Sequence, residues 1–459
     1  MNYDDIKALA YRQNVKVSDL LALATNNDPF YTGRPAQRKQ AEWFARLWED
    51  FGYTTGVHLR RFHYRLVHHT NNPTKYDGTS YQNTVTDWNE LCHAGKFARY
   101  LGLVPADAFV DRRNPSPHIY AQYERGTTPP IPETEIISPN WHLPRIQDTQ
   151  LELPEVVVTG YDYALEDQPY HLEVWAEKST MDDVLIPVCS KYGVNLVTGI
   201  GEMSITAVDD LIQRVSESEK PARILYISDF DMKGKDMPIS VSRKIEFMLS
   251  ERHDADIKLR PIVLTAEQVK EYDLPRIPYE IKTNISESRQ KALQTRKDAF
   301  EAAYGNGVVE LDALQGLFPG ELARLVSEQI QRYRDTDLPH KLRERENEAQ
   351  EIADRVLDDT LGPYLGEMRE LRDEINAYIA RYKDDFNAAM KGYQSRANDL
   401  LSKINGETER LHINLPPRDC ADVHGDDGNP WLFDSNRDYF EQLNIYKENR
   451  PGGQSENQN

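Results

Sequence analysis

Cysteine is scarce in this sequence. Its 459 residues include only three cysteines, which lie far apart and form no CxxC pair: Cys92, Cys189 and Cys420. So few thiols, in an odd number, provide neither a disulfide framework nor a set of zinc ligands, and they are typical of a reducing compartment. We therefore expect a cytoplasmic protein.

Long apolar runs and a signal-like start are also missing. No segment approaches about 18 consecutive apolar residues, the length that a membrane-spanning helix needs. The first residues, MNYDDIKALAYRQ, lack the basic stretch followed by an apolar run that marks a secretory signal. We expect no membrane as a partner.

Positive charge is in deficit, but unevenly. The chain carries 55 Lys and Arg against 75 Asp and Glu, a net charge of −20, which argues against nucleic-acid binding along its whole length. Residues 1–125 hold 16 basic and 13 acidic residues, a balance of +3, whereas the rest holds 39 and 62, a balance of −23. A nucleic-acid surface is therefore expected in the first quarter of the chain.

A chain of this length predicts two or three domains, and the first, residues 1–125, has helical periodicity. We expect helices over 38–51, 57–68 and 84–101. Thr84 or Thr86 is a plausible N-cap for the last of these, and an extended segment, 103–113, follows it. This order is that of a winged helix-turn-helix, although a generic helical domain would give the same pattern.

The central region changes period. Residues 126–160 are rich in Pro and Thr and are interpreted as a linker. Within 161–335, strand candidates alternate with helix candidates, which predicts an α/β domain with a mainly parallel sheet. The expected strands are 171–178, 194–199, 223–229 and 257–265.

The last part of the chain reads as helical. Residues 336–415 are expected to form a long helical arm, broken at Pro363. Apolar residues recur every three or four positions from Ile375 to Ile404, which predicts one long amphipathic helix, either in a coiled-coil arm or packed on its own domain. Residues 416–459 are expected to be a tail that ends in disorder.

Acidic residues follow two of the predicted strands. ILYISDFDMKG ends on Asp229 and Asp231, and HLEVWAEK ends on Glu177 and Lys178. Because the carboxyl ends of parallel strands meet at one edge of a sheet, the three carboxylates should lie close together, where they would raise one another's pKa without a cation. Oxygen ligands with no nearby Cys or His suit Mg²⁺.

These motifs resemble the Toprim domain of topoisomerases, primases and some nucleases. The resemblance rests on Glu-Lys at a strand end, a glycine-containing loop (TGIGEMS), and a later strand followed by DxDxxG, which is Asp229, Asp231 and Gly234. It implies that Glu177, Asp229 and Asp231 bind Mg²⁺ beside a phosphodiester.

An upstream segment makes the resemblance more specific. HLRRFHYRLV looks like the nucleophile helix of the topoisomerase VI A subunit and of its meiotic double-strand-break relative, in which an Arg precedes the catalytic Tyr by four residues. Arg60 and Tyr64 keep that spacing, and His58 stands where the family often has Thr. LTAEQVKEYDLP and VVELDAL also resemble bacterial and plasmid members. The resemblance covers about residues 50–330.

The resemblance implies a DNA-cleaving enzyme in which Tyr64 attacks a phosphodiester and forms a 5′-phosphotyrosine bond. A phenol with a pKa of about 10 is a poor nucleophile at neutral pH, so a cation such as Arg60 or a base such as His63 is expected to assist it. In the family, Tyr of one protomer works with the Toprim domain of the other, which implies a homodimer. Duplex DNA should bind a basic face: Arg60, Arg61, Arg65, Lys96 and Arg99.

Other readings remain open. The sequence has no GxxxxGK[ST] loop and no GHKL-type ATPase motif, so a topoisomerase would need a separate ATPase subunit of GHKL or SMC type. Alternatively, the chain is a Toprim nuclease in which metal-activated water attacks and Tyr64 is structural. A third reading is a non-catalytic DNA-binding or assembly factor in plasmid maintenance or phage defence. Asp312, in VVELDAL, is either a partner of the acidic site or an N-cap. All these readings place the protein in the cytoplasm, with the nucleoid.

Overall fold

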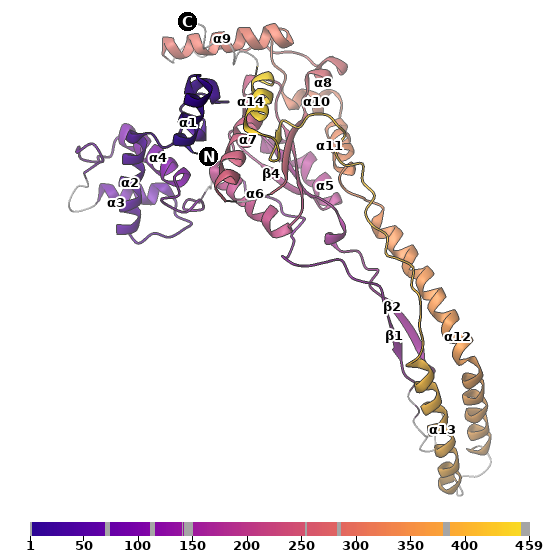
Figure 1. The fold of residues 1–459 in the computed structure, drawn as a ribbon. Coiled ribbons are helices and arrows are strands. Elements are labelled where there is room, and N and C mark those ends of the chain that lie inside the picture. Colours follow the sequence, from indigo (N-terminus) through magenta and orange to yellow (C-terminus); the bar gives the residue numbers. More distant parts are fainter. Residues whose placement is uncertain are drawn as a thin grey trace. The chain divides into compact units, whose positions relative to one another are not determined.

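The structure, a computed structural model, describes residues 2–68, 74–110, 115–139, 141, 150–252, 255–281, 286–379 and 386–450. It is mixed α/β and forms two compact units, coloured along the chain in Figure 1. The first unit comprises Met1–Gly126, Pro169–Arg334 and Val423–Asn459, and the second comprises Thr127–Gln168 and Asp335–Asp422. None of the helices in the described ranges is both long and apolar enough to cross a membrane.

A five-stranded sheet with the order β4-β3-β5-β6-β7 lies in the first unit. Its strands are β3 (His171–Ala176), β4 (Asn195–Thr198), β5 (Ala222–Ile227), β6 (Ile257–Val263) and β7 (Phe433–Asp434). The first four are parallel, and β7 pairs with β6 in the antiparallel sense. Every residue of β3 and β5 is buried, as in central strands covered on both faces. The predicted mainly parallel α/β architecture is confirmed.

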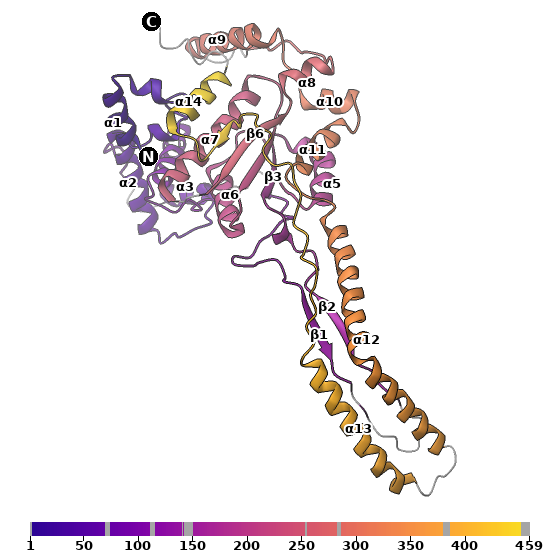
Figure 2. The same ribbon diagram turned by 45° about the vertical axis from the view of Figure 1, so that its right-hand side comes forward.

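Helices cover both faces of this sheet. They are α5 (Asp182–Tyr192), α6 (Ile205–Ser218), α7 (Met232–Arg252), α8 (Ala266–Glu271), α9 (Glu287–Tyr304), α10 (Leu311–Leu317) and α11 (Glu321–Gln331). Trp175 and Tyr226 enter the core shared with α6 and α7, whereas Val174 and Leu225 enter the core shared with α5 and α11. Figure 2 shows these two pairs of helices on opposite sides of the strands. The alternation fixes which side chains face each core.

The first quarter of the chain is helical, as predicted. Its helices are α1 (Tyr3–Gln13), α2 (Pro35–Asp50), α3 (Leu59–Val67) and α4 (Val85–Tyr100). Thr84 accepts a hydrogen bond from the Asp87 amide and is the N-cap of α4. Aromatic rings hold α2 and α3 together, with the ring centroids of Phe44 and Phe62 4.7 Å apart.

The segment 103–113, predicted to be extended, consists mostly of turns where it is described. Phe109 forms a single bridge with Val57, so this segment returns the chain to the start of α3. Residues 111–113 lie outside the described residues.

From residue 423 on, the expected tail contributes to the first unit. It supplies β7 and the helix α14 (Tyr439–Glu448). Leu443 and Tyr446 are buried in the same core as α7, and the Tyr439 hydroxyl donates a hydrogen bond to the Leu20 carbonyl. This part is therefore packed and not a free tail. The disorder predicted for the final residues falls on 451–459, outside the described residues.

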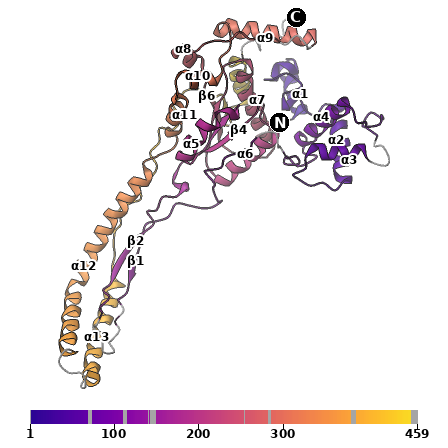
Figure 3. The same cartoon turned by 180° about the vertical axis from the view of Figure 1, so that it is seen from behind.

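The second unit contains β1 (Glu133–Ile137), β2 (Glu155–Thr159), α12 (Leu338–Ile379) and α13 (Phe386–Thr408). The segment 126–160, interpreted as a linker, thus contains two strands, which pair antiparallel. Val156 and Val158 are buried in a core with both long helices. Figure 3 shows the strands running beside α12. The Pro and Thr content was a poor guide here because it did not reveal β2, in which buried and exposed residues alternate.

The prediction of a break at Pro363 was wrong. α12 runs through this residue to Ile379. Pro363 is exposed, so water can hydrate the carbonyl four residues earlier, which loses its helical donor.

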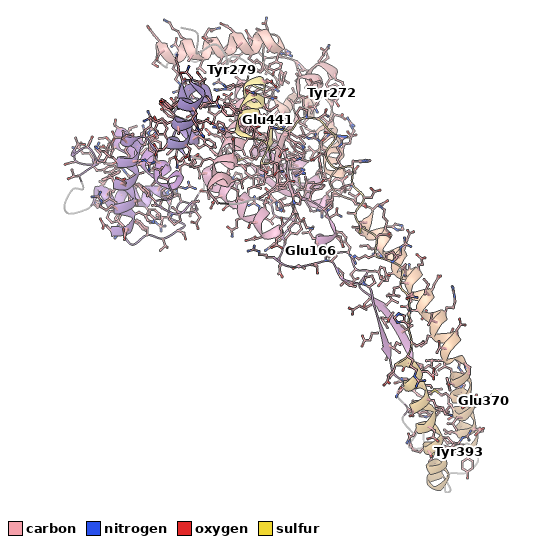
Figure 4. All side chains as sticks on the ribbon, viewed as in Figure 1. Glu166, Tyr272, Tyr279, Glu370, Tyr393 and Glu441 are labelled. Atoms are coloured by element: carbon pink, nitrogen blue, oxygen red, sulfur yellow. The ribbon has the colours of Figure 1, made fainter. Side chains whose placement is uncertain are left out.

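The single helix predicted from Ile375 to Ile404 was also wrong, because α13 begins anew at Phe386. Both helices contribute to one core, and the ring centroids of Tyr378 and Tyr393 lie 6.5 Å apart. Figure 4 labels Glu370 of α12 and Tyr393 of α13 at the same end of this pair. The apolar spacing continued because both helices serve the same core.

Candidate functional site

The strands β3 and β5 end side by side. Ala176 pairs with Ile227, and the Glu177 amide donates to the Ile227 carbonyl at 3.0 Å. Because β4 lies on one side of β3 and β5 on the other, the strand order reverses here, at the position where open α/β sheets bind ligands. Glu177 and Asp229 therefore stand at the same carboxyl edge, as the sequence predicted.

A tight turn holds the two aspartates. Asp231 Oδ1 accepts a hydrogen bond from the Gly234 amide at 2.6 Å, and the Ser228 hydroxyl donates to the Gly234 carbonyl at 3.0 Å. A Cβ on Gly234 would lie 1.9 Å from the Asp229 carbonyl oxygen. Only glycine fits this approach, which gives the glycine of the DxDxxG pattern a steric role.

Glu177 is a buried carboxylate with one unsatisfied oxygen. Its side chain is 7% exposed, and Oε2 has no hydrogen-bond partner. Burial, followed by the charges of Asp229 and Asp231, raises the pKa of Glu177 to about 7, although Lys178 opposes the shift. A buried charge without a partner is costly, so this group favours either a proton or a cation beside it.

The two aspartates have different environments. Burial, and less strongly the charge of Asp229, raises the pKa of Asp231 against the hydrogen bond from Gly234. Asp229 Oδ1 accepts from the Leu311 amide at 2.9 Å, and its Oδ2 lies 2.6 Å from Lys178 Nζ. Asp229 is thus satisfied by the protein, whereas Asp231 and Glu177 retain unfavourable charge.

A third segment brings two more carboxylates to this edge. Val309 exchanges two hydrogen bonds with Phe230, at 2.8 and 3.0 Å. The next residues include Glu310 and Asp312, each with a carboxylate oxygen 4.0 Å from Lys178 Nζ. Of the two roles considered for Asp312, the N-cap of α10 falls to Glu310. Asp312 is therefore a neighbour of the acidic site. Sequence reasoning missed Glu310, although the ELD spacing repeats that of DFD.

Tyr64 lies on an exposed face of α3. Its side chain is 54% exposed, whereas Phe62 and Leu66 of the same helix are fully buried. Arg60 and Arg61 are exposed as well, and the Arg60 guanidinium lies 6.0 Å from the centroid of a Trp88 ring. The structure thus places Tyr64 and two of the predicted DNA-binding arginines on solvent-accessible turns of one helix.

Arg65 is exposed but has protein partners. Its Nη1 donates to the Phe51 carbonyl at 2.8 Å, and its guanidinium lies 4.3 Å from the centroid of the Phe51 ring. These contacts hold the end of α2 against α3, so Arg65 is less available to a phosphate than Arg60 or Arg61.

His63 does not fit the expected role of a base for Tyr64. It is buried; its Nδ1 lies 2.6 Å from the Tyr81 hydroxyl and its Nε2 3.1 Å from Asn83 Oδ1. Both ring nitrogens are therefore engaged in the interior. On α3, His63 shares the buried face of the helix with Phe62 and Leu66.

Lys96 and Arg99 also point inward. Arg99 is 8% exposed and donates to Thr206 Oγ1 at 2.9 Å. Lys96 Nζ donates to the Asn26 carbonyl at 3.2 Å, and burial lowers the pKa of Lys96. These residues do not share the exposed face of Arg60 and Arg61, because α6 and the segment before α2 cover their side of α4.

The acidic edge fits a hard cation in its chemistry. In the parts of the chain that the structure describes, no three His, Cys, Asp or Glu side chains are gathered as a ready-made metal site. The unsatisfied Oε2 of Glu177 and the raised pKa of Asp231 nevertheless mark oxygen ligands that a cation would stabilise.

No protein-family model matches the sequence, and no curated protein matches it.

Proposed function

We propose that this chain cleaves DNA in a Mg²⁺-dependent reaction of the topoisomerase VI A type. The observation that supports it most is the unsatisfied, buried Oε2 of Glu177 at the edge where β3 and β5 end beside Asp229. The central sheet would then be a Toprim domain, and the helices before it a winged helix-turn-helix. Duplex DNA is the proposed substrate.

Mg²⁺ would be held by Glu177 and Asp231 together with Asp229. When bound, it would supply positive charge to the phosphate as the 3′ oxygen leaves. The negative charge of these side chains, which raises the pKa of Glu177, would be offset by the ion. Protonation of Glu177 would compete with this binding.

Tyr64 is the proposed nucleophile. Its oxygen would attack phosphorus, the bond to the 3′ oxygen would break, and the phenolic proton would pass to solvent while the 3′ oxygen gains one. The guanidinium groups of Arg60 and Arg61 would hold the DNA backbone near Tyr64. Both are exposed on the same helix, and a homodimer would bring Tyr64 of one protomer to Glu177 of the other. Religation coupled to strand passage would need a separate ATPase subunit of GHKL or SMC type.

A water-dependent nuclease is the second candidate. The same carboxylates would hold the Mg²⁺ that activates the water. This candidate is favoured by His63, because both of its ring nitrogens are engaged in the interior and it offers Tyr64 no base. In this version Tyr64 would be dispensable.

The two candidates differ in the product. Wild-type protein, Mg²⁺ and supercoiled DNA would be incubated, denatured and resolved on gels that detect protein-linked 5′ ends. A tyrosine-linked adduct that Tyr64→Phe abolishes supports the proposal. Tyr11→Phe is the matched control, because Tyr11 is 89% exposed and lies on α1. Cleavage by Tyr64→Phe with free 5′ phosphates would favour the nuclease instead.

A further inference from the structure

Lys178 brings a positive charge into the group of carboxylates. Its Nζ lies 2.6 Å from Asp229 Oδ2 and 4.0 Å from a carboxylate oxygen of both Glu310 and Asp312. A lysine side chain, whose ordinary pKa is about 10.4, is charged near neutral pH. A charged ammonium group is therefore fixed among three acidic side chains.

The backbone holds Lys178 in this position. The Ser179 amide donates to the Gly199 carbonyl at 3.0 Å, and the Gly201 amide donates to the Glu177 carbonyl at 3.2 Å. These bonds place Lys178 opposite Ile200 in an isolated bridge. The TGIGEMS loop thus fixes the backbone on both sides of Lys178.

The carboxylates at this edge form two sets. Asp229, Glu310 and Asp312 surround the ammonium group. Glu177 keeps a buried oxygen without a hydrogen-bond partner, and Asp231 is half-buried in the turn that follows β5. The Lys178 ammonium group provides a cation for Asp229, Glu310 and Asp312. Glu177 and Asp231 have no such cation in direct contact among the described residues.

We infer that Lys178 takes the position of a second divalent cation, so that this edge binds one divalent ion, at Glu177, Asp231 and Asp229, and not two. This inference rests on the proposed Mg²⁺ site. Paired-metal sites place two ions about 3.5–4 Å apart with carboxylates between them. Here Asp229 would be shared between one ion and the ammonium group, which repels a second ion from Glu310 and Asp312. Lys178 is thus a positioning residue that sets the metal stoichiometry.

The test counts Mn²⁺ ions bound to the full chain by the loss of the free-ion electron paramagnetic resonance signal. Wild type should bind about one ion per chain and Lys178→Met about two, because the substitution exposes three carboxylates to a hard cation. Lys233→Met is the matched control. Lys233 is exposed and its charge acts on Asp231, so its loss strengthens the first site without opening a second. Adding Glu310→Gln and Asp312→Asn to Lys178→Met should return the count to one.

Two results would overturn the inference while leaving the metal site intact: two ions in the wild type, or a single ion in Lys178→Met with an unchanged circular dichroism spectrum. If Lys178→Met does not fold, Lys178→Gln serves in its place, because its amide keeps polarity without charge. Absence of any bound Mn²⁺ in the wild type would remove the metal site itself, and the inference with it.

Discussion

Glu173 lies within β3 and Glu177 directly follows this strand, but the two carboxylates have opposite environments. Glu173 is fully buried and accepts hydrogen bonds from His171, Trp175 and Arg214 at 2.7–2.8 Å. Burial alone would raise the pKa of Glu173, but the charge of Arg214 and the hydrogen bonds hold it well below its usual range. Glu177 has a pKa of about 7 and an oxygen without a partner.

The difference distinguishes a carboxylate whose partners are all present from one that is a candidate for function. A buried acid with all its partners stabilises the fold, because removing it leaves those partners unpaired. A buried acid that lacks a partner destabilises the fold and is retained for another reason. Burial alone would not distinguish Glu173 from Glu177.

The largest expected effect is on stability. Glu173→Ala should lower the free energy of unfolding by about 3–5 kcal/mol, because the buried His171 and the half-buried Arg214 would lose their carboxylate partner. Urea unfolding followed by circular dichroism measures the change. A loss below about 1 kcal/mol would mean that Glu173 is not the structural member of the pair.

The converse effect concerns Glu177. Glu177→Gln should leave stability unchanged or increase it, and should slow Mg²⁺-dependent strand cleavage by about 100-fold, which corresponds to about 2.7 kcal/mol of transition-state stabilisation. Initial rates of supercoiled-DNA relaxation or linearisation measure this effect. An unchanged rate would remove Glu177 from the site.

The two glutamates should also respond differently to pH. The folded-state pKa of Glu177 is raised from 4.5 to about 7, so the folded state binds its proton more tightly. Its unfavourable contribution is absent below about pH 4.5 and grows as the pH rises to about 7, reaching at most about 3 kcal/mol. Between pH 5 and 8, wild type should lose more stability than Glu177→Gln, and Mg²⁺ at pH 8 should reduce the difference.

Equal pH slopes for the wild type and the Glu177→Gln variant would contradict this expectation. Glu173 should not add to the change of stability between pH 5 and 8, because its pKa is lowered and it stays ionised over that range. Its stabilising effect is present above the unfolded-state pKa and is lost only as the pH falls towards the folded-state pKa.

The smallest effect concerns the α3 surface, where Arg60 and Arg61 are exposed to solvent. Arg60→Gln with Arg61→Gln should reduce the slope of log binding constant against log salt by about one unit for each lost phosphate contact. Lys96→Gln is the control, because Lys96 is held against the Asn26 carbonyl. Fluorescence anisotropy with duplex DNA measures the slopes. A slope that changes in the control and not in the double variant would move the DNA surface elsewhere.

Much of the sheet and its acidic edge could be predicted from the sequence. The apolar runs of β3 and β5 predicted buried parallel strands. Because the carboxyl ends of parallel strands share one edge, Glu177 and Asp229 were expected to lie together. The sequence did not reveal Glu310, because its approach depends on the bridge between Phe230 and Val309, a contact between segments far apart in the chain.

Long-range packing also explains the other differences. Helical spacing identifies the faces of α4 but not which of them α6 covers, so Arg99 was expected to be exposed. The fold of the second unit depends on β2 packing against α12, which the composition of 126–160 did not reveal. Sequence patterns predicted a residue's environment correctly where it depended on that residue's own helix or strand. They failed where it depended on packing against an element far away in the chain.

The account's central claim, that Tyr64 and the Glu177 edge act together on DNA, is tested most directly by mixing two variants that are each defective in one half of the site. Tyr64→Phe chains retain the carboxylates, and Glu177→Gln chains retain the tyrosine. After unfolding and refolding as an equal mixture, about half of the dimers would contain one complete composite site. The account predicts single-strand nicks and a 5′ adduct carried only by the Glu177→Gln chain. Tyr64→Phe alone should give no adduct and Glu177→Gln alone should give it about 100-fold more slowly than wild type. A mixture no more active than its parts would contradict the account.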